Sequence, residues 1–235
     1  MYLHVSDFKN FYKTNLGKIV KNEINFFLKK YSSVYSDQIF STFGYFQNDL
    51  SRNGIKFLNF FDNRHGVIKN IIEEKESKNI LVNQEYLPIE DSALNHILAI
   101  HYLEYSNNIR LSLNELWRVL APEGTAYFLL PNKFSFWSIK NISPFSNGLS
   151  FSKLTIENFL NLNNFDIQFI ERLIYFPPTN SNFLQKKNLL FNKFGPTLWK
   201  NFNGLYMIVA KKRVYSRLSK QKNKIFSRKA ELSRI

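Results

Sequence analysis

Three residues that could serve a chemical site each follow an apolar run of the 235-residue chain. Gly44 follows "IFSTF", Asp62 follows "KFLNFF" and His101 follows "LNHILAI". If these runs are strands of one parallel sheet, all three residues lie at its carboxyl edge, where such sheets bind ligands. Taken alone, a single glycine is typical of a tight turn, Asp-Asn after a strand of another turn, and a lone histidine of a structural role. The residue types therefore mark an edge of a sheet rather than a reaction.

Metal and thiol chemistry find no support in the residue types. The chain has no cysteine, which excludes disulfides, thiolate metal ligands and a cysteine nucleophile. His4, His65 and His96 do not have the spacing of a metal site, so we expect no bound metal. No set of catalytic side chains stands out in the sequence.

The spacing of apolar side chains predicts the elements that position these residues. Residues 3–30 place apolar side chains three and four apart, which predicts an amphipathic helix, or two helices if Gly17 interrupts it. Residues 37–50 and 54–66 are predicted to contain strands that end in turns. Residues 94–100 are apolar at nearly every position, as expected for a strand buried on both faces of a parallel sheet.

A helix and a second apolar strand follow this buried strand. "APEG" is predicted to end the helix, with Gly124 in a left-handed turn, and "TAYFLLPN" is the next strand. Strand, helix and strand within about 40 residues form a βαβ unit. A further helix at 152–164 and two final strands at 165–178 and 204–213 complete a doubly wound α/β sheet. The helix between the strand at 94–100 and "TAYFLLPN" is predicted to have one apolar face, which consists of Leu111, Leu113, Leu116, Trp117 and Leu120.

The formal charge of +14 is concentrated at the C-terminus. From Lys211 onward ten Lys and Arg accompany one Glu, so this tail carries +9. Such a run predicts weak contact with nucleic acid or an anionic surface, although a solvated tail has the same composition. The start lacks the order of a signal peptide, and no apolar run reaches the roughly 18 residues of a membrane span. We expect a cytoplasmic protein without a transmembrane segment.

The order of residues resembles a known family. "LPIEDSALNHILAIHYLEY", "LNELWRVLAPEG" and "LLPN" are similar to the later half of the class I S-adenosylmethionine-dependent methyltransferase domain, type 11. "MYLHVSDFKNFYKTNLGKIV", "FGYF" and "FSFWSIKNISPFSNGLSFSKLTIENFL" resemble a bacterial branch of methyltransferase-like proteins with a degenerate glycine motif. The resemblance implies a seven-stranded, mostly parallel, Rossmann-like sheet with an N-terminal helical segment. It divides the chain into a helical extension (1–36), the α/β domain (37–213) and the basic tail (214–235).

The resemblance also implies S-adenosylmethionine as the cofactor and a first group of contacts. The glycine-rich turn of the family corresponds to "STFGYF", which contains Gly44 and Tyr45 but has Thr42 where an earlier glycine is expected. Asp62 corresponds to the acidic residue that holds the ribose hydroxyls. Replacing Gly44 with Val is expected to abolish cofactor binding and leave the fold intact.

The second group of contacts lies around the fourth strand. Asn83, followed by Gln84, stands where an Asp of the family contacts the adenine amino group, and an amide oxygen can accept the same bond. His101 ends the fourth strand, where cofactor and substrate meet in the family. Each of these residues is equally consistent with a plain structural or solvated role.

The methyl acceptor is not identified by any motif. Phe134, Phe136 and Trp137 follow the fifth strand, where the family often builds its acceptor pocket, although aromatic side chains are also typical of a core. Methyl transfer from a sulfonium depends mainly on alignment, so the sequence assigns no catalytic residue.

Three hypotheses remain from the sequence. The leading one is a methyltransferase that uses S-adenosylmethionine on an unidentified acceptor. The second is a catalytically inactive methyltransferase-like binding or scaffold protein, which Thr42 and Asn83 favour. The third is a nucleic-acid-binding variant that uses the basic tail.

Overall fold

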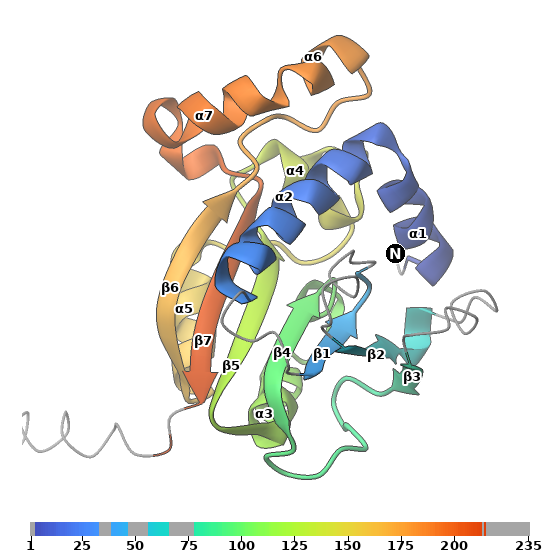
Figure 1. Ribbon diagram of the computed structural model, residues 1–235, viewed down its shortest axis with the longest axis vertical. Helices are drawn as coiled ribbons and strands as arrows, with labels where there is room; N and C mark the ends of the chain where they lie inside the picture. The colour runs from blue at the N-terminus through green and yellow to red at the C-terminus, as the bar shows by residue number, and fades with distance from the viewer. Residues whose placement is uncertain (1–2, 33–38, 47–55, 66–77, 213, 215–235) are drawn as a thin grey trace, which may run out of the picture.

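Seven strands form a single sheet in the computed structural model, which describes residues 3–32, 39–46, 56–65, 78–212 and 214. The strand order is β3-β2-β1-β4-β5-β7-β6, and all neighbours are parallel except the pairs that contain β7 (Figure 1). This order confirms the predicted seven-stranded, mostly parallel sheet. The strands are β1 (Ile39–Gly44), β2 (Lys56–Asp62), β3 (Lys78–Val82), β4 (Leu94–Ile100), β5 (Leu120–Pro131), β6 (Phe165–Leu173) and β7 (Leu205–Lys212).

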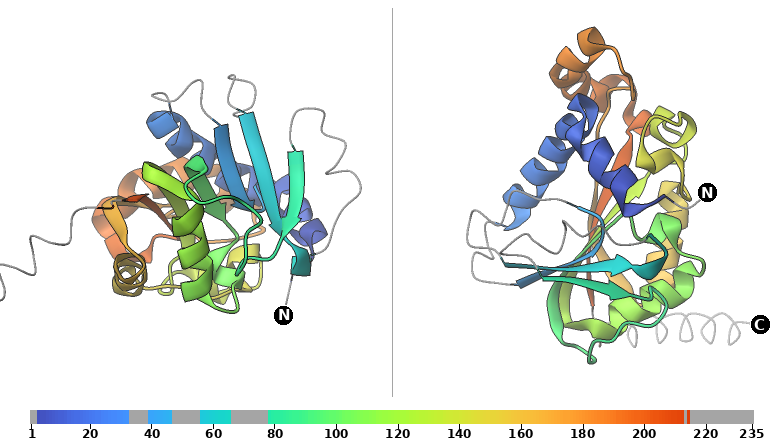
Figure 2. Two further views of the ribbon diagram at one scale, coloured as in Figure 1. Left: turned by 90° about the horizontal axis from the view of Figure 1, so that it is seen from below. Right: turned by 90° about the vertical axis from the view of Figure 1, so that its right-hand side faces the viewer.

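Helices cover both faces of the sheet (Figures 1 and 2). α1 (Val5–Lys13) and α2 (Asn15–Ser32) pack on one face, and α3 (Ile109–Val119) and α5 (Lys153–Leu162) pack on the other. Beyond the carboxyl ends of the parallel strands lie α4 (Phe136–Ile139), α6 (Asn182–Lys186) and α7 (Asn188–Leu198). Short 3-10 turns are η2 (Asn63–His65), η4 (Leu103–Tyr105), η5 (Pro144–Ser146) and η6 (Lys200–Phe202).

The N-terminal segment is two helices, and they separate at Thr14 rather than at Gly17. The Thr14 hydroxyl donates to the Phe11 carbonyl at 2.7 Å and accepts from the Gly17 amide at 3.0 Å, so one side chain ends α1 and starts α2. A Cβ on Gly17 would overlap the Phe11 carbonyl. The glycine therefore lets the two helices pack closely where they meet.

The βαβ unit is present, with two differences from the predicted details. α3 ends at Val119 and β5 begins at Leu120, so the expected turn at Gly124 is wrong; the left-handed residue there is Glu123, with φ of 59°. The buried face of α3 consists of Ser112, Leu113, Leu116 and Val119, whereas the predicted core residue Leu111 is 43% exposed.

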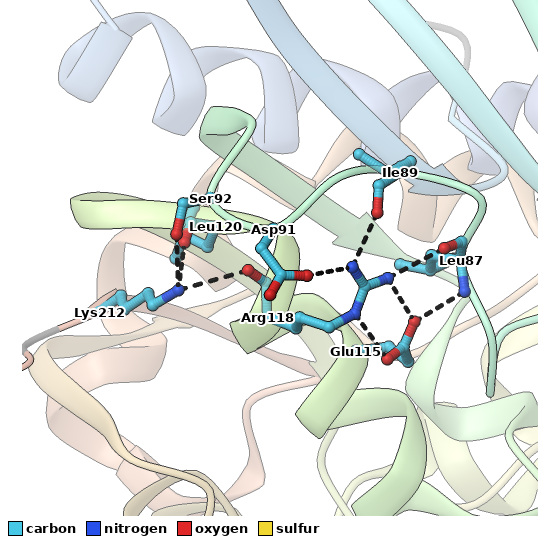
Figure 3. A network of polar contacts seen from close by, with 8 residues as sticks. All are labelled: Leu87, Ile89, Asp91, Ser92, Glu115, Arg118, Leu120 and Lys212. Atoms are coloured by element: carbon cyan, nitrogen blue, oxygen red, sulfur yellow. Dashed lines mark hydrogen bonds and ion pairs between the residues drawn. The ribbon is translucent and has the colours of Figure 1, made fainter.

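Arg118 fastens the end of α3 to the loop before β4 (Figure 3). Its guanidinium donates to both carboxylate oxygens of Glu115 at 2.9 and 2.8 Å and to Asp91 at 2.6 Å. It also donates to the carbonyls of Leu87 and Ile89 at 2.9 and 2.8 Å. The Arg118 side chain lowers the pKa of Glu115 mainly through their hydrogen bonds. The "LPIED" and "WRVL" stretches thus meet through one arginine.

Lys212, the last residue of β7, closes the same corner (Figure 3). Its ammonium group donates to the Leu120 carbonyl at 2.7 Å and lies 4.1 Å from the centre of the Trp117 ring. Burial lowers the pKa of Lys212. Because β7 runs antiparallel to β5, the chain leaves the sheet at the edge opposite the carboxyl ends of the parallel strands.

Candidate functional site

The sheet brings Gly44, Asp62 and His101 to one edge. β1 lies between β2 and β4, with Gly44 opposite Ile100, so the ends of all three strands are neighbours. α1 lies across these ends (Figure 2, right). The arrangement places predicted cofactor residues from three strands within one region, because the carboxyl ends of parallel strands lie at the same edge of a sheet.

Gly44 is required by the strand beside it. Its φ is +87°, and an added Cβ would overlap the Ile100 carbonyl oxygen and lie 2.8 Å from the His101 carbonyl oxygen. The expectation that Gly44→Val leaves the fold intact is therefore wrong, because the branched side chain would strike the backbone of β4. Thr42 lies two residues earlier in β1 and is fully buried.

Asp62 is buried and held by an arginine of the same chain. The Arg64 side chain donates from Nε to Oδ1 and from Nη2 to Oδ2, both at 2.8 Å, and the Arg64 backbone amide donates to Oδ1 at 2.8 Å. Asp62 is 1% exposed. The carboxylate predicted to hold a ribose is thus already engaged.

Gln84 continues this network to the fourth strand. Its Oε1 accepts from Arg64 Nη2 at 3.0 Å, and its Nε2 donates to the Tyr102 carbonyl at 3.1 Å. The Tyr102 hydroxyl donates back to the Gln84 carbonyl at 3.1 Å, and burial raises the pKa of that hydroxyl. Asn83 is exposed instead, and its Oδ1 accepts from the Glu85 amide at 2.9 Å, so it shapes a surface turn.

His101 is fully buried in a left-handed conformation, with φ of 53°. The Tyr12 hydroxyl of α1 lies 2.9 Å from its Nε2. On the other side of the ring, Glu104 Oε1 lies 3.2 Å from Nδ1, out of line for a hydrogen bond. Burial and the charge of Glu104 raise the pKa of Tyr12, so the phenol stays neutral. A Tyr-His-Glu series therefore links α1 to the end of β4.

Phe8 seals this edge with aromatic contacts. Its ring centre lies 5.8 Å from that of Tyr45, 5.4 Å from His65, 4.9 Å from His101 and 5.5 Å from Tyr105. Tyr45 is itself buried, and it also stacks on Tyr12. The first helix thus covers the ends of these strands with aromatic side chains.

The structure separates the three aromatic residues that were predicted to line an acceptor pocket. Phe136 and Trp137 line a cavity of about 420 Å³, whereas Phe134 is 58% exposed and is not part of its wall. Trp137 is buried and donates from its ring nitrogen to the Phe176 carbonyl at 2.8 Å. The remaining wall is almost wholly aromatic: Tyr175, Phe176, Pro177, Phe191, Trp199 and Phe202.

Sequence reasoning missed the residues that hold the edge closed. Tyr12 and His101 are 89 positions apart, so no local pattern connects them. Arg64 stands two residues after Asp62, and this short spacing is the signal that could have suggested a pair. Within the described ranges, no cluster of three or more His, Cys, Asp or Glu side chains is placed to hold a metal. No helix in those ranges is both long and apolar enough to cross a membrane.

Comparison with known proteins identifies the type of domain. Residues 41–128 match the family model of a methyltransferase domain. Among curated proteins no sequence relative was found.

Solved structures show the same fold at low identity. A S-adenosylmethionine-dependent methyltransferase from Archaeoglobus fulgidus is 19% identical, with a TM-score of 0.62 over 87% of this chain and 97% of its own. One from Thermotoga maritima is 13% identical, with a TM-score of 0.55 over 84% and 98%. The cyclase SpnF is 14% identical, with a TM-score of 0.58 over 82% and 81%. The fold therefore also occurs in a protein named for a different reaction.

Proposed function

We propose that the chain belongs to the class I S-adenosylmethionine-dependent methyltransferases, and that it binds this cofactor and methylates a separate acceptor. Residues 41–128 match a methyltransferase domain, and the strand order fits that fold. The observation that carries the proposal is the juxtaposition of Gly44, Asp62 and His101 at three neighbouring strand ends. The polar groups at this edge suit the cofactor. The Asp62 carboxylate can accept hydrogen bonds from hydroxyls, and the Gln84 amide can bind the edge of a ring.

The described conformation is closed, so the proposal requires α1 to move. Gln84 and His101 are fully buried, and Tyr12 and Phe8 cover the end of β4. Displacement of α1 would expose His101, while Asp62 would exchange part of its bonding to Arg64 for the ligand. The cofactor affinity would then be reduced by the free energy of opening.

The chemistry that the cofactor would supply is a methyl group already activated on a sulfonium. The chain would have to align the acceptor and, where the acceptor carries a proton, to remove it. Movement of Tyr12 would let His101 accept that proton at Nε2, in the tautomer whose hydrogen is on Nδ1. Glu104, 3.2 Å from Nδ1, would stabilise the resulting imidazolium.

Calorimetric titration with S-adenosylmethionine and S-adenosylhomocysteine tests the proposal. The Tyr12→Phe variant loses the bond that holds α1 to His101, so it should bind the cofactor about threefold to tenfold more tightly than wild type. Tyr31→Phe is the matched control, because its hydroxyl bonds Glu171 on β6, away from the edge. That control should bind like wild type.

A second candidate function is a methyltransferase-like binding protein without catalysis. The observation that favours it is the complete internal pairing of Asp62 by Arg64. If folded wild type and folded Tyr12→Phe both give no heat at millimolar cofactor, this second function replaces the first.

A further inference from the structure

The segment between β6 and β7 presents an unusual amount of apolar surface. It contains α6, α7 and η6, which lie beyond the end of the sheet (Figure 1). We call the α6–α7 surface its set of exposed large apolar side chains: Phe183, Leu189, Leu190, Phe194, Leu198 and Phe202. Single exposed apolar residues are ordinary, but a group this dense on one short segment marks an interaction site.

The exposed residues of α7 form an ordered stripe. Leu190, Phe194 and Leu198 are spaced by four, so they lie in one row along the helix, and they are 54%, 49% and 68% exposed. Phe191 and Gly195 face the other way, toward the protein. The helix is therefore apolar on its outer side as well as on the side that packs.

The inner side of α7 is firmly attached. Asn192 Oδ1 accepts from the Tyr175 amide at 2.8 Å, and its Nδ2 donates to Glu23 of α2 at 2.8 Å. A Cβ on Gly195 would overlap the Tyr175 side chain, which shows how closely the helix lies on the end of β6. The outer stripe is thus held on a fixed support.

The charge around this surface has a single sign. Lys186, Lys187, Lys193 and Lys200 are exposed, and the sequence has no Asp or Glu from residue 172 to residue 230. Among the described residues, none of these lysines forms an ion pair with a carboxylate. Glu23 of α2 contacts α7 from its inner side, through Asn192.

Lysine and aromatic side chains alternate in a way that suits a membrane interface. The Lys187 ammonium lies 4.3 Å from the centre of the Phe183 ring, and that of Lys193 lies 5.6 Å from Phe194. Long lysine stems can follow apolar surface and keep their charge at headgroup level. Lys with Trp, Phe and Leu is the composition of helices that lie in a bilayer interface.

The neighbouring helix extends the apolar surface to a cavity. Phe136 and Ile139 of α4 are 53% and 69% exposed. Phe136 and Phe202 both line the aromatic cavity and are both exposed, so they stand at its mouth. The cavity therefore opens onto the same surface and can receive an apolar chain.

We propose that the α6–α7 surface docks on an anionic lipid bilayer, with the Leu190-Phe194-Leu198 stripe in the headgroup region and the lysines facing lipid phosphates. Charge complementarity selects this partner. A second copy of the chain would bring the same unpaired lysines against one another, which disfavours self-association through this face. The inference is independent of the proposed methyl transfer.

Vesicle flotation of the full chain tests the proposal, with vesicles of phosphatidylcholine alone or mixed with phosphatidylglycerol. The wild type should float with the mixed vesicles. The variant Leu190→Ser, Phe194→Ser, Leu198→Ser keeps every charge, including those of the tail, and should bind them about tenfold more weakly or worse. Leu154→Ser with Leu162→Ser is the matched control: both leucines are exposed on α5, on the other face of the sheet. This control should float like wild type.

The other outcomes overturn the proposal. Equal binding by the stripe variant and the wild type would assign any vesicle contact to the basic tail. Equal loss in the α5 control would show that exposed leucines anywhere cause the adhesion. Concentration-dependent dimers that disappear in the stripe variant, without vesicle binding, would make the surface a contact between copies of the chain.

Discussion

At the carboxyl edge, Asp62, Gln84 and His101 are buried, and each is bonded by another side chain of this chain. On the α6–α7 surface, Phe194 and Leu198 are exposed and Lys193 has no carboxylate partner among the described residues. The proposed function places ligand binding in the first region, whereas the second region has exposed apolar side chains and lysines without carboxylate partners among the described residues. The comparison shows that the fold alone does not tell which surface of a chain is exposed for binding, whereas burial and pairing of the side chains do.

The largest effect is expected at the closed edge. Gly44→Val forces a branched side chain into a left-handed conformation and against the Ile100 carbonyl, so it should lower the free energy of unfolding by at least about 4 kcal/mol. Urea unfolding followed by tryptophan fluorescence measures the loss.

Thr42→Val on the same strand is the control for this substitution. The Thr42 hydroxyl is buried without a hydrogen-bond partner, so its replacement should stay within about 1 kcal/mol of wild type or stabilise the protein. A mild effect of Gly44→Val, similar to that of Thr42→Val, would mean that β1 and β4 pack less closely at Gly44 than described.

One identical substitution compares the two regions directly. Phe8→Ala removes a fully packed ring from the edge and should cost about 3 to 5 kcal/mol. Phe194→Ala on the α6–α7 surface should change the stability by less than about 0.5 kcal/mol, because its ring is half exposed. Equal losses in urea unfolding would contradict the contrast between a sealed edge and an open surface.

The smallest expected effect is on how the free energy of unfolding depends on pH. Burial lowers the pKa of His96 in β4 from 6.5 to about 4. Between these two pKa values the unfolded chain binds a proton at His96 and the folded chain does not. The contribution of neutral His96 to the free energy of unfolding is therefore complete above pH 6.5 and is lost as the pH falls toward 4. At pH 5 the loss should be about 1 to 2 kcal/mol.

His96→Phe should reduce the difference in unfolding free energy between pH 7 and pH 5 by that amount. Burial lowers the pKa of His65 as well, so a pH dependence should remain in the variant. An unchanged pH dependence in His96→Phe would show that folding does not lower the pKa of His96. Vesicle binding through lysines should not change over this range, since lysines stay charged.

The sequence predicted the elements whose apolar pattern is continuous. β4 and the helix after it follow from such runs, and the doubly wound, mostly parallel class of the sheet follows from the alternation of strands and helices. β3 was missed because it is a short edge strand whose Ile80 and Leu81 are partly exposed. α7 was missed because it contains Gly195 and Pro196, which are typical of turns. The bond between Tyr12 and His101 joins segments far apart in the chain, so only tertiary packing reveals it.

The Arg118 cluster has a consequence for what a match to these stretches means. The residues by which "LPIED" and "WRVL" are recognised hold α3 to the loop before β4 through Arg118. A match to these stretches therefore reports how α3 is attached to the sheet, and the chemistry of the site is tested at Asp62 and His101.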